Sequence, residues 1–157
     1  NTINLIFPLG FLFLIFLQII IGAFVSGMDA GKIYNSWPLM GSSFFPDDND
    51  YSNLFKLSAF SDPSLVQFIH RKLAYLIGFI YLYLLFKIYK KKMTSLYKSI
   101  NIVGILILLQ IVLGIFTLLY GAQILIASMH QISSIFLVAS CIYFLFINTK
   151  SNLQLSN

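Results

Sequence analysis

Four long apolar stretches dominate the pattern of hydrophobic and polar positions along the chain. They cover Leu5–Met28, Leu65–Tyr89, Tyr97–Tyr120 and Ile124–Ile147. Each is long enough to cross a hydrocarbon core of about 30 Å, which takes about 20 helical residues. Because lipid offers no hydrogen-bond partner to an open backbone, such segments form helices. The pattern predicts an all-α integral membrane protein, an antiparallel four-helix transmembrane bundle that forms a single domain over residues 1–157.

A short motif occurs twice in this pattern. The segment LQIIIGAF at 17–24 returns as LQIVLGIF at 109–116, and each copy precedes a helix with a histidine near its start. The repeat predicts that the bundle is built from two helical hairpins of the same plan, packed with quasi-twofold symmetry. Gly22 and Gly114 share one position in the two copies, where they let helices approach closely or leave room for a flat ligand.

The charged residues lie mainly in the connections and orient the bundle. All five acidic residues fall in the long loop 29–62, whereas lysines crowd the short connection 87–98. By the positive-inside rule, the lysine-rich connection faces inward and the long loop faces outward. Four spans then bring both termini to the inner side. We expect a protein of the bacterial plasma membrane or the mitochondrial inner membrane, with membrane lipid as a partner.

The long loop is rich in aromatic side chains, among them Trp37, Phe44, Phe45 and Phe60. It shows no clear helix or strand pattern, and loops of this length are usually functional or disordered. The aromatic residues argue against disorder. One interpretation is an aromatic belt at the membrane interface. The other is a lid over the outer ends of the helices.

Composition narrows the classes of function. Hydrophobic residues make up 59% of the chain and charged residues 10%, and the mean hydropathy of +0.87 argues against a soluble globule. The net charge of +5 is not spread over a soluble face, so we expect no nucleic-acid partner. The single cysteine, Cys141, excludes an internal disulfide and a dithiol motif. The chain opens on Asn1 without the features of a signal peptide, which indicates a piece of a longer or processed protein.

The candidate chemistry rests on the only two histidines, His70 and His130. Ser61 or Asp62 caps the second helix with Pro63 at its first position, which places His70 about 10 Å along that helix. His130 lies at nearly the same depth in the fourth helix. Two histidines at equal depth on repeat-related helices indicate a pair of ligands. The alternative is a structural bundle whose histidines only form hydrogen bonds.

Two imidazoles suit haem iron better than zinc. Zinc takes four ligands, and no carboxylate lies in a predicted helix. Cys141 follows His130 by eleven residues, about 16 Å along the helix, and cannot join the histidines. Haem iron takes two axial ligands, and such a centre transfers electrons without an open position for oxygen. Small residues after both histidines leave room for a porphyrin edge: Ala74, Gly78, Ser133 and Ser134.

Two cations, Arg71 and Lys72, directly follow His70. In one interpretation they extend to the lipid headgroups. In the other they pair with haem propionates directed outward. Arg71 suits the second role better because its planar guanidinium matches a carboxylate.

The sequence resembles a known family. The segments GAFVSGMDAG at 22–31 and YNSWPLMG at 34–41 are similar to the signature of haem A synthase, and VQFIHR at 66–71 and MHQ at 129–131 follow in the family's order. The resemblance covers most of the chain and is to the second, C-terminal four-helix half. It implies an eight-helix membrane oxidoreductase of two similar halves. That enzyme oxidises a methyl group of haem O to the formyl group of haem A for cytochrome c oxidase assembly.

The resemblance implies that His70 and His130 are the axial ligands of a b-type haem, with haem O as the substrate of the complete enzyme. The implied partners are haem, the N-terminal half or a second copy, and haem O synthase. The resemblance also implies that the other half carries a glutamate at the position where this chain has Gln67. We therefore expect this half to bind haem without converting haem O by itself. The alternative function is a stand-alone b-type cytochrome that carries electrons in the membrane.

Overall fold

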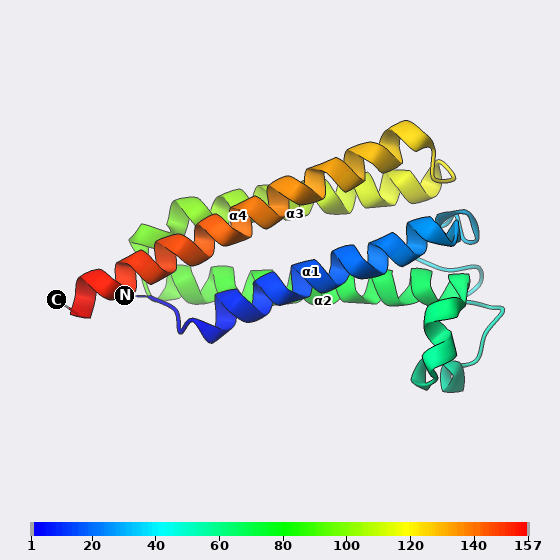
Figure 1. Cartoon of the computed structure of the whole chain (residues 1–157), viewed down its shortest axis with the longest axis horizontal. Coiled ribbons are helices and arrows are strands. Elements are labelled where there is room, and N and C mark those ends of the chain that lie inside the picture. The colour runs from blue at the N-terminus through cyan, green and yellow to red at the C-terminus, as the bar shows by residue number, and fades with distance from the viewer. Residues whose placement is uncertain (1, 157) are drawn as a thin grey trace.

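The computed structural model describes residues 2–156, and side chains as far as residue 151. Four long helices dominate it (Figure 1): α1 (Ile6–Gly27), α2 (Pro63–Lys90), α3 (Thr94–Leu119) and α4 (Ile124–Ser156). Each is long and apolar enough to cross a membrane, and none of the described residues forms a strand. The predicted all-α, four-helix membrane bundle is confirmed.

Three of the four helices, α2, α3 and α4, extend at one or both ends beyond their apolar stretches. α2 begins at Pro63, and the Asp62 side chain accepts a hydrogen bond of 3.0 Å from the Leu65 amide, as the predicted cap requires. α3 begins three residues before the expected Tyr97, and α4 continues past Ile147. The differences arise because hydropathy marks the residues that lie in lipid, whereas the backbone remains helical into the polar ends.

The four helices pack as two antiparallel hairpins, α1 with α2 and α3 with α4. Both termini lie at one end of the bundle (Figure 1). We call this the lysine end, because α2 passes into α3 there through the connection 87–98. The opposite end is the loop end. It carries the long loop and the tight turn at Gly121 and Ala122, whose φ angles of 64° and 57° are left-handed.

The long loop contains three short 3₁₀ helices: η1 (Ala30–Lys32), η2 (Tyr51–Phe55) and η3 (Leu57–Ser61). These short helices were not predicted, because helices of three to five residues are too short to show a periodic pattern. In Figure 1, η2 and η3 lie beside the loop-end part of α2, off the side of the bundle. Residues 30–39 instead stay close to the ends of the helices.

The main apolar core fills the part of the bundle nearer the lysine end. All four helices contribute to it, with Phe11, Leu84, Leu96 and Phe144 among its fully buried members. Towards the loop end, its last buried residues, one from each helix, are Ile15, Ile77, Ile107 and Leu137.

Candidate functional site

Four residues occupy equivalent places in the four helices, beyond the main core on the side of the loop end. They are Gly22, His70, Gly114 and His130, and each lies seven residues from the last core residue of its own helix. Seven helical residues correspond to about 10 Å. The structure therefore places the two histidines at a common level, as the sequence predicted from their distance to the helix starts.

Each glycine makes space for the histidine of its own hairpin. A Cβ atom at Gly22 would lie 3.2 Å from Cε1 of His70, and one at Gly114 would lie 3.1 Å from Cε1 of His130. Carbon atoms in van der Waals contact are about 3.5–4.0 Å apart, so a methyl group at either position would push the imidazole away. Of the two roles predicted for the glycines, the structure shows the close approach, and the group that approaches is an imidazole ring.

Two glutamines hold the backbone beside the histidines in the same repeated manner. Gln18 donates from Nε2 to the carbonyl of His70, and Gln110 donates from Nε2 to the carbonyl of His130, each at 3.1 Å. The second contacts differ: Gln18 Nε2 lies 3.2 Å from His70 Nε2, whereas Gln110 donates to the hydroxyl of Ser133. These glutamines were not among the predicted site residues. Both glutamines occupy the same position of the repeat inside apolar helices, and this could have predicted that they belong to the site.

Both imidazoles carry a nitrogen without a partner. Nδ1 of His70 and Nδ1 of His130 are buried and accept or donate no hydrogen bond among the described residues. An unsatisfied buried polar group costs about 1–3 kcal/mol, and here the cost occurs twice at repeat-related positions. Neutral imidazole nitrogens are common metal ligands.

The set of donors fits a haem better than a bare metal ion. Among the described residues no three His, Cys, Asp or Glu side chains gather in a group that could hold a metal ion. A haem iron brings four porphyrin nitrogens and needs only two axial groups from the protein. Cys141 belongs to the main core, towards the lysine end, and stands apart from the histidines as predicted.

Arg71 is held by the long loop. Nη1 donates to the carbonyls of Ser36 and Leu39 at 3.0 and 3.3 Å, and Nη2 donates to the carbonyl of Tyr34 at 3.0 Å. Gln67 donates to the same Tyr34 carbonyl at 3.1 Å. The guanidinium therefore acts as a clamp on the loop backbone, a contact that the sequence did not suggest. Its Nε is buried without a partner among the described residues, and the contact with propionates stays a prediction.

Lys72, the second predicted cation, lies among aromatic rings. Its Nζ is 5.3 Å from the ring centroid of Phe44, 5.0 Å from that of Phe68 and 5.5 Å from that of Tyr75. These distances are within the range of cation–π attraction. Lys72 thus joins the loop, through Phe44, to α2.

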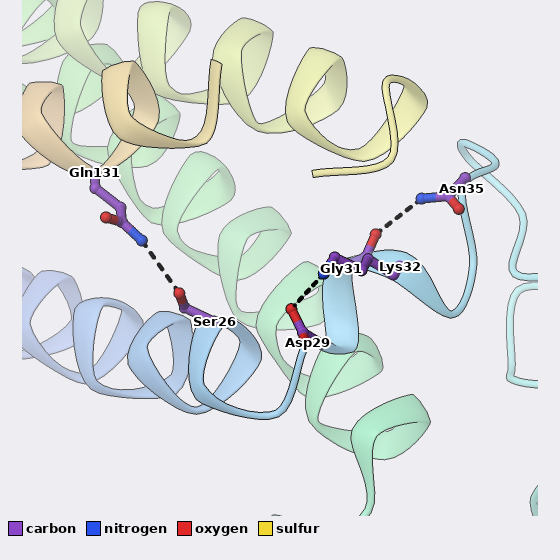
Figure 2. A network of polar contacts seen from close by, with 6 residues as sticks. All are labelled: Ser26, Asp29, Gly31, Lys32, Asn35 and Gln131. Carbon is purple, nitrogen blue, oxygen red and sulfur yellow. Dashed lines mark hydrogen bonds and ion pairs between the residues drawn. The ribbon is translucent and has the colours of Figure 1, made fainter. Parts of the chain in front are cut away.

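The first part of the loop bridges the two hairpins at the loop end. Asn35 donates to the carbonyl of Gly31 at 2.8 Å and to that of Leu118 in α3 at 2.9 Å. Figure 2 shows Asn35 beside Gly31, and it also shows Gln131 of α4 reaching the Ser26 hydroxyl of α1 at 3.4 Å. Residues 30–39 thus lie where the lid interpretation places them.

Acidic residues hold the loop together rather than facing the histidines. Tyr34 donates to Asp48 at 2.8 Å, and burial together with this bond raises the pKa of the Tyr34 phenol. Hydrogen bonds from the amide and hydroxyl of Ser42 lower the pKa of Asp47. Burial raises the pKa of Asp62, but hydrogen bonds from Asn49 and from the start of α2 outweigh it, so the pKa is lowered.

Comparison with known proteins identifies relatives over most of the chain. The family described as "Cytochrome oxidase assembly protein" matches residues 4–142. A protein of Pelagibacter ubique named haem A synthase is 46% identical over 152 residues, which are 97% of this chain and 44% of that protein. Haem A synthases of Rickettsia bellii and Rickettsia prowazekii are 41% and 40% identical over 88% and 92% of this chain. The chain spans less than half the length of these relatives. No solved structure matches it.

Proposed function

The chain belongs to the cytochrome oxidase assembly protein family, and on this premise we propose that it is the haem-binding four-helix half of a haem A synthase. The complete enzyme would be an oxidoreductase that converts the methyl group of haem O to the formyl group of haem A for cytochrome c oxidase. Similarity to proteins named haem A synthase supports this proposal. Residues 1–157 would form one transmembrane domain.

The repeated arrangement around His70 and His130 is the observation that carries the proposal. Each imidazole packs against a glycine, each histidine carbonyl accepts a bond from a glutamine, and each Nδ1 lacks a partner among the described residues. His70 and His130 would hold a b-type haem as its two axial ligands. Bound there, the haem would supply one-electron transfer without an open position for oxygen.

The other residues of the site would bind and orient. Gln18 and Gln110 fix the backbone that carries the ligands, and residues 30–39 would shield the loop end of the site from water. Arg71 would be the propionate partner, because its Nε still lacks a hydrogen-bond acceptor among the described residues. The remaining partners in this proposal are the other half of the enzyme or a second copy, and haem O synthase.

We place the loop 29–62 on the outer side of the membrane and the connection 87–98 on the inner side. The lysine excess of that connection supports this orientation. A cysteine introduced at the exposed Asp50 should react with an impermeant thiol reagent in intact cells, and one introduced at Lys91 should react only after lysis. The opposite pattern would reverse the assignment.

A reduced-minus-oxidised spectrum of the purified chain supplied with haem tests the proposal. A bis-histidine centre gives sharp low-spin bands, whereas absence of bands would leave a bundle whose histidines only form hydrogen bonds. A stand-alone b-type cytochrome would give the same bands, and the bis-histidine donor set favours it as a second candidate. Analysis of the haems in host membranes separates the two, because only a haem A synthase makes haem A accumulate.

A further inference from the structure

We propose that the apolar tip of the long loop is a membrane anchor that inserts into the lipid interface at the loop end. The apolar tip consists of Tyr51 and Phe55 of η2 and Leu57 and Phe60 of η3. Phe55 is 91% exposed and Leu57 is 89% exposed. These are the two highest exposures among the large hydrophobic residues of the described chain.

In η3, the apolar tip forms one face of the short helix, and the opposite face packs against the protein. Ala59 of η3 is 1% exposed and packs with Phe45 and Leu65 in a small core of its own. Residues three apart in a 3₁₀ helix lie on the same side, so Leu57 and Phe60 share a face. That face points away from the packed Ala59, and Phe60 remains 41% exposed.

Hydrogen bonds and a ring stack fix the apolar tip in place. Asn49 donates to Asp62 at 3.0 Å, Asn53 donates to Asn49 at 3.1 Å, and the Lys56 amine donates to Asn53 at 2.8 Å. The ring of Phe45 stacks on that of Tyr51 with centroids 4.0 Å apart. A segment held this firmly cannot fold its apolar side chains back into the protein. Exposed apolar side chains gathered in this way mark a site that contacts a membrane or another molecule.

Lipid is the occupant because the apolar tip continues the lipid-facing surface of the bundle. The ring of Phe60 contacts that of Phe24 with centroids 6.4 Å apart. Phe24 ends a row of exposed apolar residues on α1 that includes Phe16 and Ile20, spaced four residues apart. Residues at this spacing share one helix face, and in a membrane-spanning helix an exposed apolar face contacts acyl chains. From Phe24, the exposed apolar surface continues through Phe60 to Leu57.

The positive charge of Lys56 also fits a position of the apolar tip at the lipid headgroups. Lys56 lies between Phe55 and Leu57 in the sequence, is exposed, and is the only charged residue within residues 51–61. An amine flanked by apolar side chains is the arrangement of residues that anchor at a membrane surface, with the amine at the phosphates and the apolar groups below them. A second copy of the chain, or another part of a longer protein, is the competing occupant.

Site-directed spin labelling separates these occupants. With Cys141→Ala as the background, Phe55→Cys and Leu57→Cys are labelled with a nitroxide in nanodiscs of phosphatidylcholine and phosphatidylglycerol. Collision with oxygen reports lipid, and collision with a water-soluble nickel chelate reports water. Leu82→Cys, exposed in the lysine-end half of α2, is the lipid reference, and Asp50→Cys, exposed in the long loop, is the water reference.

We expect the oxygen-to-nickel collision ratio at positions 55 and 57 to exceed that at position 50 by at least several-fold and to approach that at position 82. A ratio equal to that of position 50 would overturn the proposal in favour of water. Low collision with both reagents would overturn it in favour of a protein partner. Leu57→Trp in a Trp37→Phe background gives an independent readout, since lipids brominated near the headgroup should quench its fluorescence strongly.

Discussion

Gly22 and His70 lie on neighbouring helices in such close contact that a methyl group at position 22 would crowd the imidazole ring and force it to shift. A Cβ at Gly22 would stand 3.2 Å from Cε1 of the imidazole, and the second hairpin repeats the relationship at Gly114 and His130 with 3.1 Å. The structure thus pairs each histidine with a glycine from the preceding helix. The position of each imidazole ring is set by the absence of a side chain opposite it.

The first prediction concerns these glycines. Gly22→Ala and Gly114→Ala should each weaken haem binding about ten-fold or more, because overpacking of this kind costs about 1–3 kcal/mol. Titration of the purified variants with haem, followed by absorbance, measures the effect. Gly10→Ala is the matched control, since no atom lies within 4 Å of a Cβ there. Alanine variants at 22 and 114 that bind haem like the wild type would contradict the role given to the glycines.

The second prediction concerns the ligands. His70→Ala and His130→Ala should each convert a low-spin haem spectrum to a high-spin one, or prevent haem from binding, because one axial ligand is lost. Added imidazole should restore the low-spin bands if the site survives with an open position. Spectra unchanged in both variants would remove the ligand assignment.

The helices and their repeat could be predicted from the sequence because both are local. Asp62 and Pro63 mark the start of α2 within two residues, and apolar stretches of more than 20 residues leave no alternative to helices in lipid. The common level of His70 and His130 followed from counting residues from two helix starts. These features need no knowledge of how distant segments meet.

The clamp on the loop could not be predicted, because it depends on where a long irregular segment returns. Nothing in the sequence near Arg71 indicates that carbonyls 32–37 residues away will meet its guanidinium. The two interpretations of the loop suit different parts of it. Residues 30–39 bridge the hairpins as a lid would, while the apolar tip extends beside α2.

The third prediction tests the clamp. Arg71→Lys should loosen residues 34–39, because an amine cannot reach the three carbonyls that the guanidinium contacts. Each hydrogen bond from a charged group contributes about 1.5–3 kcal/mol. Hydrogen–deuterium exchange of amides in 34–39 should therefore become at least ten-fold faster. Lys72→Gln is the control, since Lys72 contacts aromatic rings only outside this segment, and equal protection in both variants would disprove the clamp.

The fourth prediction is a pH dependence at the start of α2. Because the pKa of Asp62 is lowered in the folded protein, its carboxylate stabilises the fold above the ordinary carboxyl pKa of about 4, and this contribution is lost as the pH falls below it. Asp62→Ala should cost about 1 kcal/mol at pH 7. Thermal unfolding in mild detergent should show the difference from wild type shrinking below about pH 4. Asp62→Asn, which caps without titrating, should show no such loss.

The final prediction is that this chain binds haem yet does not convert haem O to haem A by itself. Oxidation of the methyl group requires a substrate haem in addition to the haem that carries electrons. The only two histidines of the chain would both be ligands of one iron, which leaves no imidazole for a second haem.

Proton transfer inside the bundle would also lack a carrier. All five acidic residues precede α2 in the loop 29–62, so none lies in the four long helices. Gln67, one turn before His70, donates to the carbonyl of Tyr34, and an amide cannot take up a proton at neutral pH. The test supplies haem O, a reductant and oxygen to the purified chain and to Gln67→Glu, then extracts and separates the haems. We expect no haem A from either, because a carboxylate at position 67 adds no second haem site. Haem A formed at a catalytic rate by the unaltered chain would show that four helices suffice and that the division between the two halves is wrong.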